Sequence, residues 1–146
     1  MPARRPGKKG QRKRKIAGAS KYRIFISHSS SNSWIAKQIA KELEALGFRT
    51  WLDSKDLKGG DIWQQKIMDG INASQEGLVL VSPDSVKSFW VAFEIGALRG
   101  QGKTVTPLLN GVAPKDMASM QEVQAKDLNR FDEFLEELID RFKQKK

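Results

Sequence analysis

Hydrophobic and polar positions follow two alternating patterns along the chain, which predict strands and helices in turn. Short apolar runs rich in β-branched and aromatic residues predict strands, at residues 22–26, 48–52, 78–81 and 104–109. Elsewhere apolar residues recur every three or four positions, which predicts amphipathic helices, over residues 35–46, 62–73, 89–100 and 131–142. A weaker segment at residues 116–126 leaves room for a fifth short strand.

The alternation of strand and helix predicts the fold class. It is typical of an α/β protein in which helices cover both faces of a parallel sheet. We therefore expect a three-layer, flavodoxin-like fold with a five-stranded parallel sheet. In such folds ligands bind beyond the carboxyl ends of the strands. The loops at 27–33, 53–61 and 82–88 should converge there, together with the start of the helix that carries Glu94.

The composition narrows the class of protein. With 146 residues, the chain is long enough for one domain with a substantial core. It has no cysteine and a single histidine, His28, which excludes disulfides, thiolate metal sites and histidine-rich metal centres. We propose no metal. No apolar run approaches the roughly 18 residues of a membrane span, and no apolar segment of a secretory signal follows the N-terminal charges. We expect a soluble, cytoplasmic protein without a transmembrane segment.

The net charge of +9 is concentrated at the N-terminus. Residues 1–21 hold nine basic residues and no acid, so the other 17 basic residues balance the 17 acidic ones in residues 22–146. This composition predicts a disordered basic tail, residues 1–21, ahead of a folded domain, residues 22–146. The tail either binds nucleic acid, anionic lipid or an acidic partner, or is a solubilising extension. We expect that deleting residues 1–20 leaves the fold intact.

Glu94 is the one charged residue in the apolar stretch Phe89–Leu98. Trp90 lies four residues earlier, so a helix would project both side chains from one face. Two interpretations remain open from these residues. The acid and the ring form half of a small-molecule site, or the stretch is a helix edge with Glu94 in water and Trp90 in the core.

Three segments of the chain resemble the Toll/interleukin-1 receptor (TIR) domain family. The first is Phe25–Ser29, which begins three residues after Tyr22. The second is the strand Gly47–Asp53 with the BB loop that follows it, including Leu57–Asp61. The third combines Val81-Ser82-Pro83 with a Trp-x-x-x-Glu signature at Trp90 and Glu94. The resemblance covers about residues 21–143, in the order that the predicted topology requires.

The resemblance implies two kinds of function, because the family contains both enzymes and adaptors. The enzymatic members cleave NAD+ with a glutamate where Glu94 stands. This implies an NAD+ nucleosidase that gives nicotinamide and linear or cyclised ADP-ribose, in a defence, cell-death or signalling context. NAD+ would be the substrate, with no further cofactor. The alternative is a non-catalytic module that self-associates through the BB loop, residues 53–61. A third possibility is a nucleoside deoxyribosyltransferase-like enzyme.

A single carboxylate is chemically sufficient to cleave NAD+. Nicotinamide carries a positive charge in NAD+ and leaves as a neutral base, so no general acid is needed. What remains is to stabilise the oxocarbenium-like ribose, which a preorganised carboxylate can do. Glu94 must be ionised for this role. We therefore expect it at a wet cleft rim or beside a hydrogen-bond donor, and not in dry core.

The resemblance also suggests residues that contact the substrate. Trp90 either stacks on a flat ring of the substrate or packs the helix against the sheet. Ser29 and Ser30 either offer hydroxyl and backbone donors to ribose or phosphate, or cap the next helix. Lys58 either meets a phosphate or is solvated, and Gly60 allows the BB loop to act as a mobile lid.

Overall fold

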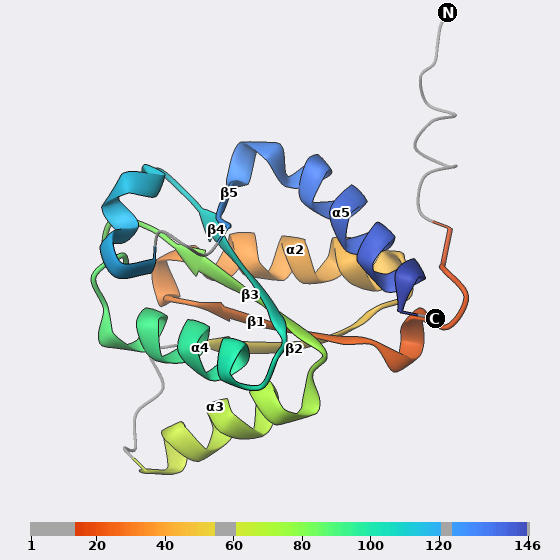
Figure 1. Ribbon diagram of the computed structural model, residues 1–146, viewed down its shortest axis with the longest axis horizontal. Helices are drawn as coiled ribbons and strands as arrows, with labels where there is room; N and C mark the ends of the chain where they lie inside the picture. Colours follow the sequence, from red (N-terminus) through yellow and green to blue (C-terminus); the bar gives the residue numbers. More distant parts are fainter. Residues whose placement is uncertain (1–13, 55–60, 121–123, 146) are drawn as a thin grey trace, which may run out of the picture.

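The fold is a five-stranded parallel sheet with helices on both faces, as the sequence predicts (Figure 1). The computed structural model describes residues 14–54, 61–120 and 124–145. The strands are β1 (Arg23–His28), β2 (Arg49–Ser54), β3 (Glu76–Val81), β4 (Thr104–Leu109) and β5 (Lys126–Asp127), in the order β2-β1-β3-β4-β5. The α-helices are α2 (Ser33–Ala45), α3 (Asp61–Ala73), α4 (Phe89–Gly100) and α5 (Phe131–Gln144). Short 3-10 turns lie at η1 (Ala19–Lys21), η2 (Ser30–Asn32), η3 (Pro114–Met120) and η4 (Leu128–Arg130).

Two hydrophobic cores lie on opposite faces of the sheet. Alternate strand residues point to opposite faces, so Ile24 and Ile26 join the core under α2 and α5 while Phe25 joins the core under α3 and α4. β3 divides its side chains in the same way and is buried along its whole length. Figure 1 shows α2 and α5 on one side of the strands and α3 and α4 on the other.

The element boundaries differ from the prediction at two places. β1 continues through Ser27 and His28, which the sequence assigned to a loop, because both residues pair in register with the end of β2. The fifth strand is only Lys126–Asp127, at the end of the segment that was expected to hold it. The first part of that segment forms η3 instead.

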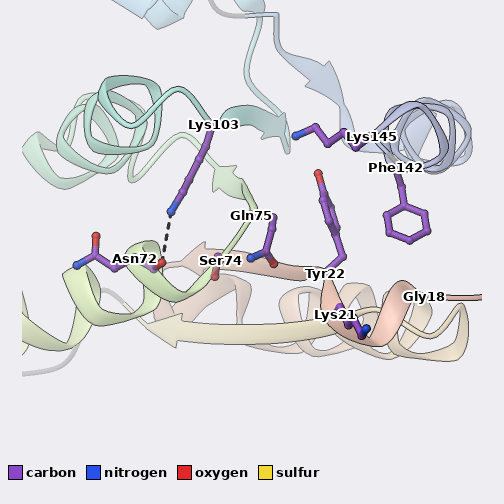
Figure 2. Close-up of a pocket in the computed structure, with 9 residues that line it drawn as sticks. All are labelled: Gly18, Lys21, Tyr22, Asn72, Ser74, Gln75, Lys103, Phe142 and Lys145. Carbon is purple, nitrogen blue, oxygen red and sulfur yellow. Dashed lines mark hydrogen bonds between the residues drawn. The ribbon is translucent and has the colours of Figure 1, made fainter.

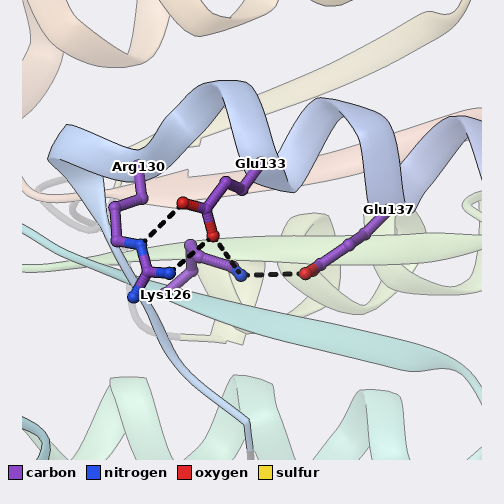
Figure 3. Close-up of polar contacts among 4 residues, drawn as sticks. All are labelled: Lys126, Arg130, Glu133 and Glu137. Atoms are coloured by element: carbon purple, nitrogen blue, oxygen red, sulfur yellow. Dashed lines mark hydrogen bonds and ion pairs between the residues drawn. The ribbon is translucent and has the colours of Figure 1, made fainter.

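β5 is joined to α5 by charged side chains. Lys126 Nζ lies 2.9 Å from Glu137 Oε2 and 3.6 Å from Glu133 Oε1 (Figure 3). Arg130 Nη2 lies 2.8 Å from the same Glu133 oxygen. Exposed ion pairs contribute little stability each. The cluster therefore orients β5 against α5 more than it holds the domain together.

The folded domain begins earlier than residue 22, which corrects the predicted boundary of the tail. The backbone N–H of Ile16 donates to the carbonyl of Leu46 at 2.8 Å, and Ala19 in η1 is fully buried. Gly47 has a φ of +103°, and a Cβ there would lie 3.3 Å from that of Ala19. Ala19 thus packs closely against the turn at Gly47. Charge and composition could not reveal this contact. Residues 1–13 lie outside the described part of the chain.

Two N-terminal deletions should have different effects. Removing residues 1–13 should leave the free energy of unfolding unchanged, whereas removing residues 1–20 should lower it by roughly 1–3 kcal/mol. The longer deletion removes the buried Ala19 and the Ile16 backbone bond. Urea unfolding of both truncated proteins measures the difference. Equal stability would show that the folded domain begins after residue 21, as the sequence predicted.

Gly70 allows α3 to pack against the ring of Trp51. A Cβ at Gly70 would lie 2.6 Å from Trp51 Nε1 and 2.7–2.8 Å from two ring carbons. The Trp51 ring is rigid and packs, partly buried, against the core, so it can move away only by disturbing its neighbours. Gly70→Ala should therefore lower the free energy of unfolding by about 1–3 kcal/mol. Gly96→Ala is the matched control, because a Cβ there meets nothing within 4 Å, and the higher helix propensity of alanine should stabilise α4 by up to about 1 kcal/mol. Equal effects in urea unfolding would contradict the close packing.

The described residues form neither a membrane span nor a metal site. None of the helices within the described ranges is both long and apolar enough to cross a membrane. Nor do three or more His, Asp or Glu side chains cluster anywhere in these ranges in a way that could hold a metal ion.

Candidate functional site

Glu94 lies on the buried face of α4. Val91, Ile95 and Leu98 share that face, and Glu94 has no exposed surface. Its carboxylate meets the hydroxyl of Ser27 in β1, whose Oγ lies 2.7 Å from both Oε1 and Oε2. A hydroxyl carries one hydrogen, so it is shared between the two oxygens. The acid on α4 is therefore tied to the central region of the sheet.

Glu94 is buried beside a hydrogen-bond donor, which is one of the two expected positions, and it does not lie at a wet cleft rim. Burying a carboxylate without a partner costs several kcal/mol in practice. The Ser27 hydroxyl supplies a donor, so the site is polar and not sealed among aliphatic groups alone. Ser27 lies two residues after Phe25, so both side chains leave β1 on the face that α4 covers. The sequence missed this contact because it assigned Ser27 to a loop.

Polar side chains link the loops that follow three neighbouring strands. After β1, the Asn32 amide donates to Ser82 Oγ, which follows β3, at 3.0 Å. Asn110, which follows β4, donates to Asn32 Oδ1 at 3.2 Å. Ser31 donates to Asp84 Oδ2 at 3.0 Å, and Ser82 donates to the other oxygen of the same carboxylate. The loops at 27–33 and 82–88 therefore converge as expected, and hydrogen bonds hold them in place.

Ser29 and Ser30 belong to the first of these loops. Ser29 is partly exposed, and its hydroxyl lies 3.0 Å from the hydroxyl of Ser31. Its carbonyl accepts from Nδ1 of the buried His28 at 2.8 Å, which gives that histidine a structural contact. The Ser30 side chain is exposed. The N-cap of α2 is Asn32, without a side-chain capping bond, so neither serine caps that helix.

Trp90 lies in the first turn of α4 and packs on the core beneath α3 and α4. Its backbone N–H donates to the N-cap hydroxyl of Ser88 at 3.1 Å. Its ring meets Phe93 edge-on, with centroids 5.6 Å apart, and Phe89 at 5.2 Å. The Trp90 ring therefore packs against the core, as one of its two interpretations predicts. Its role toward a substrate stays a prediction.

Two predicted site residues and most of one loop cannot be placed. Lys58 and Gly60 lie outside the described residues, and so does most of the BB loop. The residues that sequence reasoning missed are the partners around the site: Ser27, Asn32, Asp84 and Asn110. The alternation along β1 could have found Ser27. The other three carry no sequence signal beyond their position after a strand.

The family model of the TIR domain matches residues 24–139 of the chain. Among solved structures, the TIR domain of a Toll-related receptor from Hydra magnipapillata superposes with a TM-score of 0.58 at 20% identity. That match covers 83% of this chain and 95% of the receptor domain, and it shows the fold alone.

Curated relatives match over part of their length. The 2' cyclic ADP-D-ribose synthase AbTIR of Acinetobacter baumannii is 32% identical over 101 residues, 66% of this chain and 38% of that protein. The NAD(+) hydrolase TcpA of a Theionarchaea archaeon is 25% identical over 80% of this chain and 37% of its own length. The chain thus spans well under half of these relatives. Because the family model covers most of the sequence and the fold agrees with it, the chain belongs to the TIR domain family.

Proposed function

We propose that the protein is an NAD+ nucleosidase, which cleaves the nicotinamide–ribose bond and yields nicotinamide with linear or cyclised ADP-ribose. The proposal rests on the position of the Glu94 carboxylate, which accepts a hydrogen bond from Ser27 on the face of the sheet that α4 covers. Relatives named as a cyclic ADP-ribose synthase and an NAD+ hydrolase support it. NAD+ is the substrate, and no further cofactor is needed.

Glu94 would act by electrostatic stabilisation. Nicotinamide takes the electron pair of the breaking C–N bond and leaves as a neutral base. Positive charge then develops on the ribose, and a nearby carboxylate stabilises it. Water, or a nucleophilic group of the same ADP-ribose, then bonds to the ribose carbon and loses a proton, which gives the linear or the cyclised product. Ser27 donates its hydrogen to the carboxylate and helps to hold it in place. In this proposal Glu94 is the catalytic residue and Ser27 is a positioning residue.

The burial of Glu94 supports activation by self-association. A carboxylate with no exposed surface cannot reach a ribose until neighbouring side chains move. Contacts between protomers that favour an open arrangement would shift that equilibrium. The surfaces proposed for self-association are those around the BB loop, residues 53–61. Specific activity should therefore rise with protein concentration.

The remaining substrate contacts are part of the same proposal. Ser29 and Ser30 stand in the loop that follows β1, with an exposed hydroxyl on Ser30 that is available to ribose or phosphate. Trp90 would stack on a ring of the substrate, and Lys58 and Gly60 would act from the BB loop. We propose the cytoplasm as the compartment, because a chain without cysteine needs no oxidising environment.

Mass analysis of NAD+ incubations tests the function. Purified protein should release nicotinamide together with ADP-ribose or its cyclic form, and the yield per protein molecule should increase across a concentration series. Deoxynucleosides serve as the control substrate, since their turnover would favour a deoxyribosyltransferase. If NAD+ stays intact at every concentration, including those at which the protein assembles, the enzymatic proposal is wrong.

Exposed aromatic side chains favour a second candidate, a non-catalytic interaction module. Trp34 at the start of α2 is 72% exposed, and Phe89 at the start of α4 is 67% exposed. Large exposed apolar side chains are common at interfaces. Assemblies or partner complexes that form without any nicotinamide release would favour this candidate.

A further inference from the structure

A cavity of about 610 Å³ lies at the opposite edge of the sheet from Glu94. Tyr22, Gln75 and Lys103 line it, and they immediately precede β1, β3 and β4. The end of α5 closes another side with Phe142 and Lys145. Ser27 is five residues along the chain from Tyr22, which is roughly 16 Å in a strand. The cavity is therefore separate from the proposed catalytic site.

Three lysines line this cavity, and the described residues place no acidic side chain in its lining. The lysines are Lys21, Lys103 and Lys145. Within the described part of the chain, none of the three forms an ion pair with an acid. The nearby Glu76, which accepts from the Tyr22 hydroxyl at 2.7 Å, is already paired with Arg141 at 2.9 Å. The lining thus carries positive charge that no acidic residue in the described ranges neutralises by an ion pair.

Several donors remain available to a ligand. Lys103 Nζ donates to the carbonyl of Ile71 at 2.7 Å and reaches that of Asn72 at 3.5 Å, which leaves one of its three hydrogens. Partial burial also lowers the pKa of Lys103, and a bound anion would oppose that effect. Gln75 Oε1 accepts from the Arg23 backbone at 2.5 Å, which leaves its amide hydrogens free. Figure 2 shows Lys145 over the hydroxyl end of Tyr22, with Lys103 on the other side of Gln75.

In contrast to the charged lysines, one wall of the cavity is aromatic, and this aromatic wall consists of Tyr22 and Phe142. The rings of Tyr22 and Phe142 pack edge-on with centroids 5.3 Å apart, and Lys145 Nζ lies 5.7 Å from the Tyr22 centroid. We propose that this cavity binds a small organic phosphate of nucleotide size, with its phosphates on the lysines and its apolar body against Tyr22 and Phe142. The volume is within the range of small-ligand sites. This inference does not depend on the proposed function.

Charge reversal at two exposed lysines tests the site, with adenosine diphosphate as the probe. The test protein carries Lys21→Glu and Lys145→Glu, and the matched control carries Lys37→Glu and Lys143→Glu. All four lysines are exposed, and both proteins have the same net charge. Backbone amide NMR shifts report where the probe binds. Wild type should show saturable shifts at residues 72–75 and at Lys103, and the test protein should bind at least about tenfold more weakly, because each lysine supplies a charge-assisted bond.

The same titrations define what would overturn the proposal. An equal loss of affinity in the control protein would show binding to general positive charge. Shifts confined to residues 27–33 and 88–94 would assign the nucleotide to the Glu94 edge instead. Inorganic pyrophosphate and adenosine probe the two halves of the ligand, and each should bind more weakly than the diphosphate. Pyrophosphate that binds as tightly as the nucleotide would overturn the role of the aromatic wall.

Discussion

Glu94→Gln should reduce nicotinamide release from NAD+ by at least about 10²–10³-fold, because removing one preorganised electrostatic group from an active site has effects of that size. Glutamine has nearly the same shape as glutamate and can still accept from Ser27. The substitution therefore removes the negative charge with little change in packing. Single-turnover mass analysis of nicotinamide measures the loss.

Two companion variants separate a catalytic effect from a structural one. Glu137→Gln removes a carboxylate from an exposed position on α5 and should leave nicotinamide release unchanged. Ser27→Ala removes the donor but keeps the charge, so it should lower the rate by a smaller factor of about ten. Glu94→Gln should unfold at or above the wild-type urea concentration, since a neutral amide is less costly to bury than a carboxylate. A Glu94→Gln protein with full activity would remove Glu94 from the mechanism.

Arg141→Met should lower the free energy of unfolding by about 3–5 kcal/mol, the usual cost of leaving a buried charge without its partner. Glu76 at the start of β3 has no exposed surface, and Arg141 Nη2 lies 2.9 Å from its Oε2. The Tyr22 hydroxyl donates to the other oxygen at 2.7 Å. These contacts join β3, α5 and the entry to β1. Urea unfolding measures the loss.

The double variant Arg141→Met with Glu76→Gln identifies the cause of that loss. It removes the buried charge as well as its partner, so stability should recover by a large part of the deficit. Exposed Arg99→Met, at the end of α4, controls for the loss of one positive charge. If the double variant is no more stable than Arg141→Met alone, the loss comes from packing of the arginine stem and not from an unpaired carboxylate.

The titration of the Tyr22 hydroxyl also tests the contacts among Tyr22, Glu76 and Arg141. Tyr22 is the only tyrosine of the chain, and burial, followed by the charge of Glu76 and its hydrogen bond, raises the pKa of its hydroxyl. The unfolded chain should ionise near the ordinary value of about 10, and the folded protein only above it. Because the folded pKa is the higher one, the stability linked to Tyr22 is complete below about pH 10 and falls as the pH rises further. Phenolate absorbance in buffer and in urea checks this, and identical titration curves would contradict it.

The local pattern of apolar and polar residues was sufficient to predict the fold. The continuous apolar runs of β3 and β4 are typical of strands buried on both faces, and the spacing of apolar residues in α2 and α5 matches the helices. The order of these elements left a parallel sheet as the main solution. The prediction was weakest where the elements are short. The two-residue β5 has too few residues to show a period, and η1 has no apolar run.

The candidate site could be predicted only in part. The lone acid in an apolar helix drew attention to Glu94, and the loops expected beside it do converge after β1 and β3. Its full burial could not be foreseen, and its bond to Ser27 was missed because the sequence assigned Ser27 to a loop. A solitary acid in an apolar sequence is consistent with either a helix edge or a buried site, and only the packing of α4 against β1 distinguishes them.

The sequence by itself determined the elements, their order and the family, because hydrophobic periodicity and short motifs are local properties of a chain. Tertiary structure decided which side chains meet across the sheet. It joined Ser27 to Glu94 at one edge, and it gathered Lys21, Lys103 and Lys145 around a cavity at the other. These residues are separated by tens of positions in the chain, so burial and charge at each edge depend on the register of strands and on which helix covers them.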